Sequence, residues 1–170
     1  MPSVKTQRIA IIGNGGGGKT TLARKLGLKL DIPVSHVDSV QFLEGHRWRP
    51  TEEVRTLLDS WIQEPKWIID GFGPLDSIEQ RFLLADKIIF IDHPLWRHYF
   101  WSLKRQLKSY WKSREELPLN CSEFTMRWTL ELFQILWRVH FQLKPKLFDL
   151  IRENNFEEKI IWIKTKADLK

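Results

Sequence analysis

Eight residues near the start of the chain have the types and spacing needed to bind a chain of phosphates. They run from Gly13 to Thr20 and read Gly-Asn-Gly-Gly-Gly-Gly-Lys-Thr, which fits the pattern G-x-x-x-x-G-K-[ST]. Glycine tolerates positive φ and has no side chain, so such a segment can turn its N–H groups toward phosphate oxygens. The lysine and the hydroxyl that end it then contact the β- and γ-phosphates and Mg²⁺. The residues predicted to contact a nucleotide here are Gly13, Gly15, Gly16, Gly17, Gly18, Lys19, Thr20 and Thr21. Lys19 is also predicted to be a catalytic residue.

This segment lies between two elements that could position it. Residues 8–12 form a short apolar run typical of a buried strand, and residues 20–30 carry leucines at helical spacing. A helix that starts near Gly18 directs its positive end at the same anion. The pattern therefore predicts a strand, a phosphate loop and a helix in that order. The alternative interpretation is a glycine-rich turn before an ordinary helix.

Three later strand signals each end at a carboxylate. Residues 34–38 end at Asp38, residues 67–71 contain Asp70, and residues 87–92 end at Asp92. Ligands collect at the carboxyl ends of strands in a parallel sheet, so all three are candidates for the site. We predict that Asp70 binds Mg²⁺ together with Thr20, directly or through water. Asp92 fits the same role, or caps a helix that starts at Pro94.

Asp38 is predicted to act on the second substrate. It could orient or deprotonate an alcohol acceptor or contact Mg²⁺-bound water, and the alternative is a helix cap or turn residue. His36 shares a strand face with it, and we expect a structural role for His36. The polar segment 44–50 precedes an amphipathic helix predicted over 51–63. It could form a flap whose arginines, Arg47 and Arg49, bind an anionic group of the acceptor.

The stretch from Arg97 to Arg114 is the most basic part of the chain. It alternates cations with aromatic residues and holds no acidic residue. One interpretation is a lid that closes over the transferred phosphoryl group, with Arg105 and Arg114 as catalytic residues. A second is a nucleic-acid surface, and a third is an amphipathic helix with a solvated basic face. The lid is predicted at about residues 95–123.

The remaining segments complete an α/β pattern. Residues 77–85 are predicted to be helical, and residues 124–143 to form a long helix that Pro145 stops. A short helix then runs to about Arg152, and residues 158–163 supply a fifth strand. Apolar strands separated by helices predict a three-layer α/β fold with a parallel sheet. With 170 residues and 42% hydrophobic content, the chain is expected to form one domain, residues 1–170.

The composition limits the cellular location that we expect for this protein, but it does not identify the ligand. The net charge of +6 suits an anionic ligand, whether a nucleotide, a phosphorylated metabolite or nucleic acid. A single cysteine, Cys121, excludes an internal disulfide, and no apolar run is long enough for a signal peptide or a membrane span. We therefore expect a soluble, cytoplasmic protein that does not bind membranes. Its oligomeric state stays open.

Together, the phosphate loop, Asp38, the segment Trp67 to Gly71, Arg81 and the strand that ends at Asp92 resemble the adenylate-kinase-like P-loop proteins. Within that group, the spacing and the tryptophan-rich basic middle are most similar to the DNA topology modulation protein family. The resemblance implies a P-loop NTPase fold with a five-stranded sheet ordered 2-3-1-4-5. It also implies ATP and Mg²⁺ as cofactors, a mobile helical lid, and phosphate transfer to a small acceptor.

Two segments bear on this resemblance. Nucleoside monophosphate kinases commonly have D-G-F-P-R where this chain has residues 70–74 without an arginine, and the next arginine is Arg81, a candidate catalytic residue. After the last strand, Lys164 and Thr165 occupy the place where related kinases pack a loop against adenine, so we predict that both contact the nucleotide.

The function predicted from sequence is therefore an ATP-dependent phosphotransferase with an unidentified acceptor. The main alternative is a regulator that binds nucleic acid in a nucleotide-dependent way. A GTPase-like switch is a further alternative, because residues 70–73 match D-x-x-G and residues 165–168 match [NT]-K-x-D.

Overall fold

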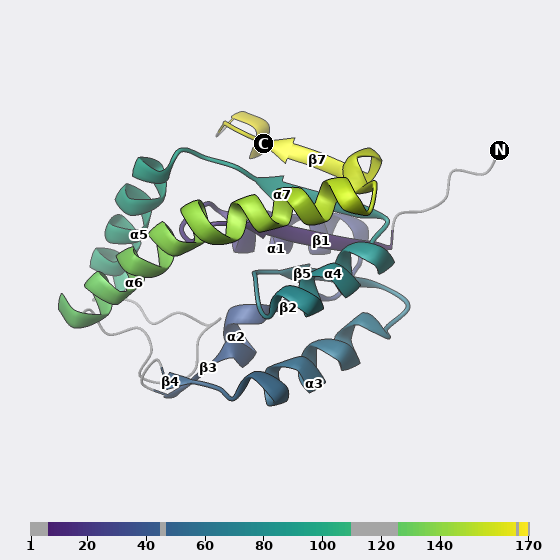
Figure 1. The fold of residues 1–170 in the computed structure, drawn as a ribbon, viewed down its shortest axis with the longest axis horizontal. Coiled ribbons are helices and arrows are strands. Elements are labelled where there is room, and N and C mark those ends of the chain that lie inside the picture. Colours follow the sequence, from purple (N-terminus) through teal and green to yellow (C-terminus); the bar gives the residue numbers. More distant parts are fainter. Residues whose placement is uncertain (1–6, 45–46, 110–125, 166, 170) are drawn as a thin grey trace.

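The computed structural model describes residues 7–44, 47–109, 126–165 and 167–169 (Figure 1). The predicted lid at 95–123 falls only partly within these residues. Arg114 lies outside them, so its predicted catalytic role stays a prediction.

Five parallel strands form the central sheet. In spatial order they are β2 (Val34–His36), β5 (Trp67–Asp70), β1 (Arg8–Gly13), β6 (Lys87–Ile91) and β7 (Ile160–Ile163). Counted in chain order among themselves, these strands follow the order 2-3-1-4-5, which confirms the predicted arrangement. The strand that precedes the phosphate loop therefore lies at the centre, with a neighbour on each side.

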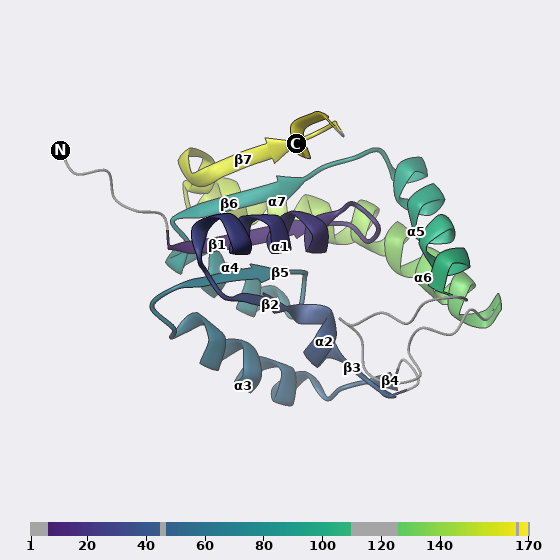
Figure 2. The ribbon, with the colours of Figure 1, turned by 180° about the vertical axis from the view of Figure 1, so that it is seen from behind.

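Helices cover both faces of the sheet and make the three predicted layers (Figures 1 and 2). One face packs against α1 (Lys19–Leu30), and the other packs against α3 (Thr51–Ile62), α4 (Leu75–Leu84) and α7 (Lys144–Glu153). Because side chains alternate along a strand, Ile9 and Ile11 face α1 while Ala10 and Ile12 face the three-helix side. Each of the three isoleucines is at least 96% buried and contributes about 1.5–3 kcal/mol. Two apolar layers thus hold the central strand, and with it the start of the phosphate loop.

Two further helices lie beyond the carboxyl ends of the strands. They are α5 (Leu95–Ser109) and α6 (Met126–Arg138), which lie side by side in both views (Figures 1 and 2). The ring centroids of Tyr99 on α5 and Phe133 on α6 are 4.8 Å apart. This helix pair covers the edge of the sheet at which the site was predicted.

The segment after β2 differs from its sequence prediction. The strand ends at His36, and α2 (Val37–Gln41) begins at once, so Asp38 lies in the first turn of a helix. A small antiparallel pair of strands follows, β3 (Phe42–Leu43) and β4 (Arg47–Trp48), and only β4 falls within the segment 44–50 that was predicted as a polar flap. Apolar periodicity could not locate either boundary, because both elements are too short to repeat a pattern.

The prediction that Pro145 stops the long helix is wrong. A π-helical turn, η2 (Val139–Leu143), follows α6 directly, and α7 follows without a break. Pro145 stands in the first turn of α7, where the missing N–H of proline costs little. The last strand also starts later than predicted, because a 3₁₀ turn, η3 (Phe156–Lys159), precedes it.

Candidate active site

The predicted phosphate loop joins the central strand to α1. Its backbone has positive φ at Gly13 (148°), Gly16 (73°) and Gly18 (89°), where other L-residues would be strained. A Cβ added at Gly13 would lie 2.4 Å from the carbonyl oxygen of Ile91 on β6. The glycines are therefore required by the conformation and by the close neighbouring strand. The strand–loop–helix arrangement predicted from sequence is present.

Helices α5 and α6 hold the outer side of this loop. Asn14, which is 6% exposed, donates from Nδ2 to the carbonyl of Leu136 on α6 (2.8 Å), and its Oδ1 accepts from the N–H of Gly15 (2.8 Å). On α5, His98 Nδ1 lies 2.8 Å from the carbonyl oxygen of Gly15. A Cβ at Gly16 would lie 2.6 Å from Ser102 Oγ. These contacts were not predicted, since no sequence pattern links the loop to residues about a hundred positions away.

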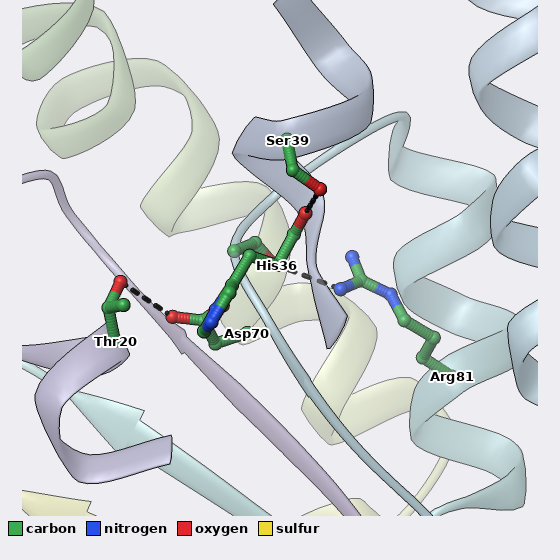
Figure 3. Close-up of polar contacts among 6 residues, drawn as sticks. Thr20, His36, Ser39, Asp70 and Arg81 are labelled. Atoms are coloured by element: carbon green, nitrogen blue, oxygen red, sulfur yellow. Dashed lines mark hydrogen bonds and ion pairs between the residues drawn. The ribbon is translucent and has the colours of Figure 1, made fainter. Parts of the chain in front are cut away.

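Asp70 lies directly opposite Thr20. Its Oδ2 accepts a hydrogen bond from Thr20 Oγ1 at 2.9 Å, and its Oδ1 lies 2.6 Å from His36 Nδ1 (Figure 3). The carboxylate is 3% exposed, because β5 ends beside the central strand. His36 is held in turn from α2, where Ser39 Oγ donates to its carbonyl (2.6 Å). A hydroxyl and an oriented carboxylate thus meet at the predicted position.

Asp92 lies at the end of β6, on the other side of the central strand. Its Oδ1 is 2.6 Å from Lys144 Nζ at the start of α7, an ion pair in which each side chain is about one-fifth to one-quarter exposed. Between these two aspartates, only Asp70 bonds to Thr20 among the described contacts. The sequence left open whether Asp70 or Asp92 binds Mg²⁺ together with Thr20, and the geometry favours Asp70.

A cavity of about 480 Å³ opens from the phosphate loop. The loop residues from Asn14 to Thr21 form one wall, so all predicted nucleotide contacts in this segment except Gly13 line it. Asp38 lines it from α2, and Arg105 lines it from α5. Lys19 also faces it, and its Nζ donates to the carbonyl of Asn14 (3.1 Å). Three of the five predicted catalytic residues thus share this cavity.

The far end of the cavity is aromatic. Phe42 and Trp48 from the hairpin and Trp128 from α6 line it together. The ring centroid of Phe42 lies 4.6 Å from that of Trp48 and 5.9 Å from that of Trp128. Sequence analysis missed this wall, although the tryptophan next to Arg47 in a polar segment is a signal that could have suggested it. Arg138 adds a second arginine to the lining, in addition to Arg105.

Arg81 does not lie where the sequence prediction requires it. It is 2% exposed and is absent from the described cavity lining. Its guanidinium donates to the backbone carbonyls of Gly71 (3.0 Å), Phe72 and Ser77 (3.2 Å), reaching across from α4 (Figure 3). Burial lowers the pKa of Arg81 to about 10, opposed by the charge of Asp70, so the side chain stays protonated near neutral pH. Its position supports the turn after β5, and through it Asp70.

Replacing Arg81 with alanine should therefore destabilise the fold. The change leaves carbonyls of the buried turn without donors and creates a cavity, so we expect the free energy of unfolding to fall by about 3 kcal/mol or more in urea titrations. Arg152→Ala, at an exposed position on α7, is the matched control and should change it by less than about 0.5 kcal/mol. If the Arg81→Ala variant is as stable as wild type but has no turnover, Arg81 has a catalytic role instead of a structural one.

Lys164 and Thr165 are not brought to the cavity. Both are exposed after β7, and their backbone N–H groups donate to Asp168 Oδ2 at 3.0 and 2.8 Å. Asp168 lies in a 3₁₀ turn, η4 (Ala167–Leu169), and those bonds lower the pKa of its carboxyl. In the segment that matches [NT]-K-x-D of the GTPase alternative, the Asp168 carboxylate therefore accepts bonds from the backbone of Lys164 and Thr165. The predicted adenine contact of Lys164 and Thr165 stays a prediction.

His98 is buried against the phosphate loop, 1% exposed. The pKa of His98 is lowered from 6.5 to about 4, chiefly by burial and to a smaller extent by the nearby charge of Lys19, while the bond to Gly15 opposes both. The ring is neutral at neutral pH, and its Nδ1–H donates to the Gly15 carbonyl in that state. The loop is therefore tied to α5 by an uncharged imidazole.

This burial predicts a pH dependence of stability. Between about pH 6.5 and about pH 4, the unfolded chain binds a proton at His98 that the folded chain does not, so stability falls as pH falls through this window. From about pH 7 to about pH 4.5 we expect wild type to lose about 2–3 kcal/mol more unfolding free energy than His98→Gln, which cannot titrate. Urea titrations of both proteins at the two pH values measure this difference. Equal losses of unfolding free energy in wild type and His98→Gln would show that His98 is not the source of this pH dependence.

The fold and the site together define a class of protein. A parallel five-stranded sheet with a complete G-x-x-x-x-G-K-[ST] loop after its central strand is the α/β architecture of P-loop proteins. Among the described residues, no helix is long and apolar enough to cross a membrane.

Comparison with known proteins returns structural neighbours only. No protein-family model matches the chain, and no curated protein matches it in sequence. Shikimate kinase from Bacteroides thetaiotaomicron is 17% identical, with 82% of this chain and 99% of that chain covered and a TM-score of 0.46. Shikimate kinase from Aquifex aeolicus is 17% identical, with coverage of 83% and 98% and a TM-score of 0.46. A gluconokinase from Sinorhizobium meliloti is 10% identical, with coverage of 97% and 86% and a TM-score of 0.47. At such low similarity, function has to be argued from the residues of this chain.

Proposed function

We propose that this protein is an ATP-dependent phosphotransferase that transfers the γ-phosphoryl group of ATP to a small acceptor. One observation carries the proposal: the phosphate loop, with Thr20 Oγ1 2.9 Å from Asp70, opens into a cavity of about 480 Å³ that also holds a carboxylate and two arginines. Phosphoryl transfer depends mainly on positioning and on neutralising charge, and this cavity contains the groups for both.

The loop end of the cavity suits the nucleotide. Its backbone N–H groups and Lys19 would hold the phosphates of ATP. Glycine is needed for this loop conformation, because a Cβ at Gly13, Gly15 or Gly16 would lie only 2.4–2.8 Å from atoms of the strand and helices packed around the loop. Mg²⁺ in such sites is commonly bound by one or two protein oxygen ligands together with substrate phosphates, and the Thr20 hydroxyl and Asp70 carboxylate are ligands of that type. The ion supplies charge neutralisation on the phosphates when bound.

Asp38 is the candidate base for the acceptor. If the acceptor is an alcohol, its oxygen forms the new bond to the γ-phosphorus while the bond to the β-phosphate oxygen breaks, and the hydroxyl proton passes to the Asp38 carboxylate. The products are then the phosphorylated alcohol and ADP. If the acceptor is itself a phosphate, no base is needed, and Asp38 serves the metal through water.

The aromatic end of the cavity suits the body of the acceptor. The rings of Phe42, Trp48 and Trp128 offer an apolar surface for a ring or a hydrocarbon face, while Arg105 and Arg138 carry positive charge on the same lining. We infer an acceptor that combines an apolar or planar part with an anionic group. Closure of a lid at 95–123 over this acceptor remains part of the proposal, and Arg105 is its described cation.

The test is ADP release from ATP and Mg²⁺ across a panel of nucleoside monophosphates, nucleosides, sugar acids and small alcohols. Acceptor-dependent release by the intact chain supports the proposal and identifies the acceptor class. GTP in place of ATP and added DNA are parallel arms. ATP binding without acceptor-dependent turnover, or salt-sensitive DNA affinity in the nanomolar range, would contradict it and favour a regulatory role.

A further inference from the structure

The outer face of α5 is apolar and exposed. Four large side chains recur at helical spacing along it, with exposed fractions from 38% to 64%: Trp96, Phe100, Leu103 and Leu107. The opposite face of the same helix carries His98, Ser102 and Gln106, which are buried. Within the part of the chain that the structure describes, the inner face of α5 is therefore covered, whereas the apolar residues of its outer face are exposed.

The neighbouring helix continues this apolar surface. Leu130 and Trp137 on α6 and Phe141 on η2 are 48% to 57% exposed. The two sets lie on either side of the contact between Tyr99 and Phe133. On α5, Trp96 is three residues before Tyr99 and Leu103 is four residues after it. On α6, Leu130 and Trp137 have the same spacing relative to Phe133. The seven side chains thus form one face across the α5–α6 pair, here named the outer face.

The size of the outer face is that of an interface. Its four aromatic side chains, each about half exposed, present on the order of 400 Å² of surface, which already falls in the range of the largest patch on a typical monomer. The three leucines bring it toward the roughly 800 Å² that each partner buries in a standard protein interface.

The composition of the outer face fits the same conclusion. Tryptophan and phenylalanine are enriched at the centres of interfaces, and polar groups surround such centres. Here Lys104 and Gln134 are exposed beside the apolar residues, Arg97 stacks over Trp96 (5.3 Å to the ring), and Arg127 pairs with Glu131 (3.0 Å). Because charges of both signs border the face, two copies related by a twofold axis could place Lys104 near Glu131 of the other copy.

We propose that the outer face binds a second copy of this chain, forming a twofold symmetric dimer in which two α5–α6 pairs pack as four helices. Most soluble oligomers are built from copies of one chain, and twofold dimers, which bury one face against the same face of the partner, are the commonest of them. Since α5 and α6 also hold the phosphate loop through His98 and the Leu136 carbonyl, the dimer would brace that loop from outside. The proposal does not depend on the acceptor or on turnover.

Sedimentation velocity of the intact chain over a range of concentrations tests the dimer. A reducing agent is included because Cys121 could link two chains covalently. We expect wild type at micromolar concentration to sediment with twice the chain mass of 20.3 kDa. Leu107→Glu, which places a charge within the outer face, should raise the dimer dissociation constant at least about a hundredfold. Phe100→Glu is a second variant with the same expectation.

Leu28→Glu is the matched control, since Leu28 on α1 is 88% exposed and lies outside the outer face. This variant should remain dimeric, and circular dichroism with urea titration checks that all three variants fold. Wild type that stays monomeric at about 100 μM, or equal dissociation by Leu28→Glu, overturns the proposal. A monomer that binds phosphatidylglycerol vesicles but not phosphatidylcholine vesicles, through Leu107 and Phe100, overturns it in favour of a lipid surface.

Discussion

Replacing Lys19 with alanine should lower ATP-dependent phosphotransfer by about a hundredfold to a thousandfold while leaving the fold intact. The ammonium group faces the cavity from the end of the phosphate loop, where it would offset the negative charge of the transferred group. Folding does not depend on it, because the loop is held by Asn14, by His98 and by its glycine conformations. Steady-state ADP release measures the rate of phosphotransfer, and a thermal melt checks that the fold is intact.

Lys25→Ala is the control for Lys19→Ala. Lys25 is exposed on the same helix, so the substitution removes an equal charge outside the cavity. We expect unchanged turnover in this variant. If Lys19→Ala keeps its rate within about threefold of wild type, the loop does not position phosphates for transfer, and the proposed function is wrong.

The second large effect is expected at Asp70. Asparagine in its place keeps the shape of the side chain but removes the negative charge opposite Thr20, so Mg²⁺ binding should weaken. We expect the rate to fall by about a hundredfold or more at millimolar Mg²⁺, with partial recovery at higher Mg²⁺. Rates measured across a Mg²⁺ series test this. A thermal melt accompanies them, because Asp70 is buried beside His36.

Asp92→Asn is the paired experiment, because Asp70 ends β5 and Asp92 follows β6, the two strands that flank the central one. The structure pairs Asp92 with Lys144, so the substitution should cost no more than a modest amount of stability and leave the Mg²⁺ dependence unchanged. The reverse outcome, loss of Mg²⁺-dependent turnover at Asp92 and not at Asp70, would transfer the metal role to Asp92. The two variants together therefore decide a question that the sequence leaves open.

Two separate predictions, the pH dependence of stability and the dimer contact, concern the same helices, α5 and α6, because these helices hold the phosphate loop. His98 on α5 supplies the pH dependence of stability, and the outer face of α5 supplies the proposed dimer contact. Both act on a loop whose Gly15 carbonyl and Asn14 side chain bond to this helix pair. Changes in self-association are therefore expected to alter the stability of the loop as well.

Much of the fold could be predicted because its signals are local. The apolar run at residues 8–12, the glycines and the leucine spacing of α1 lie within about twenty consecutive residues, and each follows from backbone sterics or side-chain periodicity. The later strands were recognisable for the same reason. The parallel order of the sheet followed from the resemblance and is confirmed. The phosphate loop and Thr20 were thus identified from residue types alone.

The boundaries of short elements and the roles of single residues were harder to predict, because no repeating sequence pattern indicates them. Asp38 was placed at the end of a strand but lies in the first turn of a five-residue helix. Arg81 was assigned to catalysis as the first arginine after β5, yet its guanidinium is buried on backbone carbonyls. Pro145 was read as a helix stop, although the first turn of a helix accepts proline. In each case the residue type is compatible with more than one environment, and only the packed structure selects among them.

The sequence by itself therefore determined the strand–loop–helix unit, the three-layer class and the carboxylates that could serve a metal. Tertiary structure alone decided that Asp70, and not Asp92, meets Thr20, and which tryptophans line the cavity and which face outward. The physical reason is the range of the interactions. Turn geometry and periodicity act between near neighbours in the chain, whereas contacts such as Asn14 to Leu136, 122 residues apart, exist only once the layers have packed.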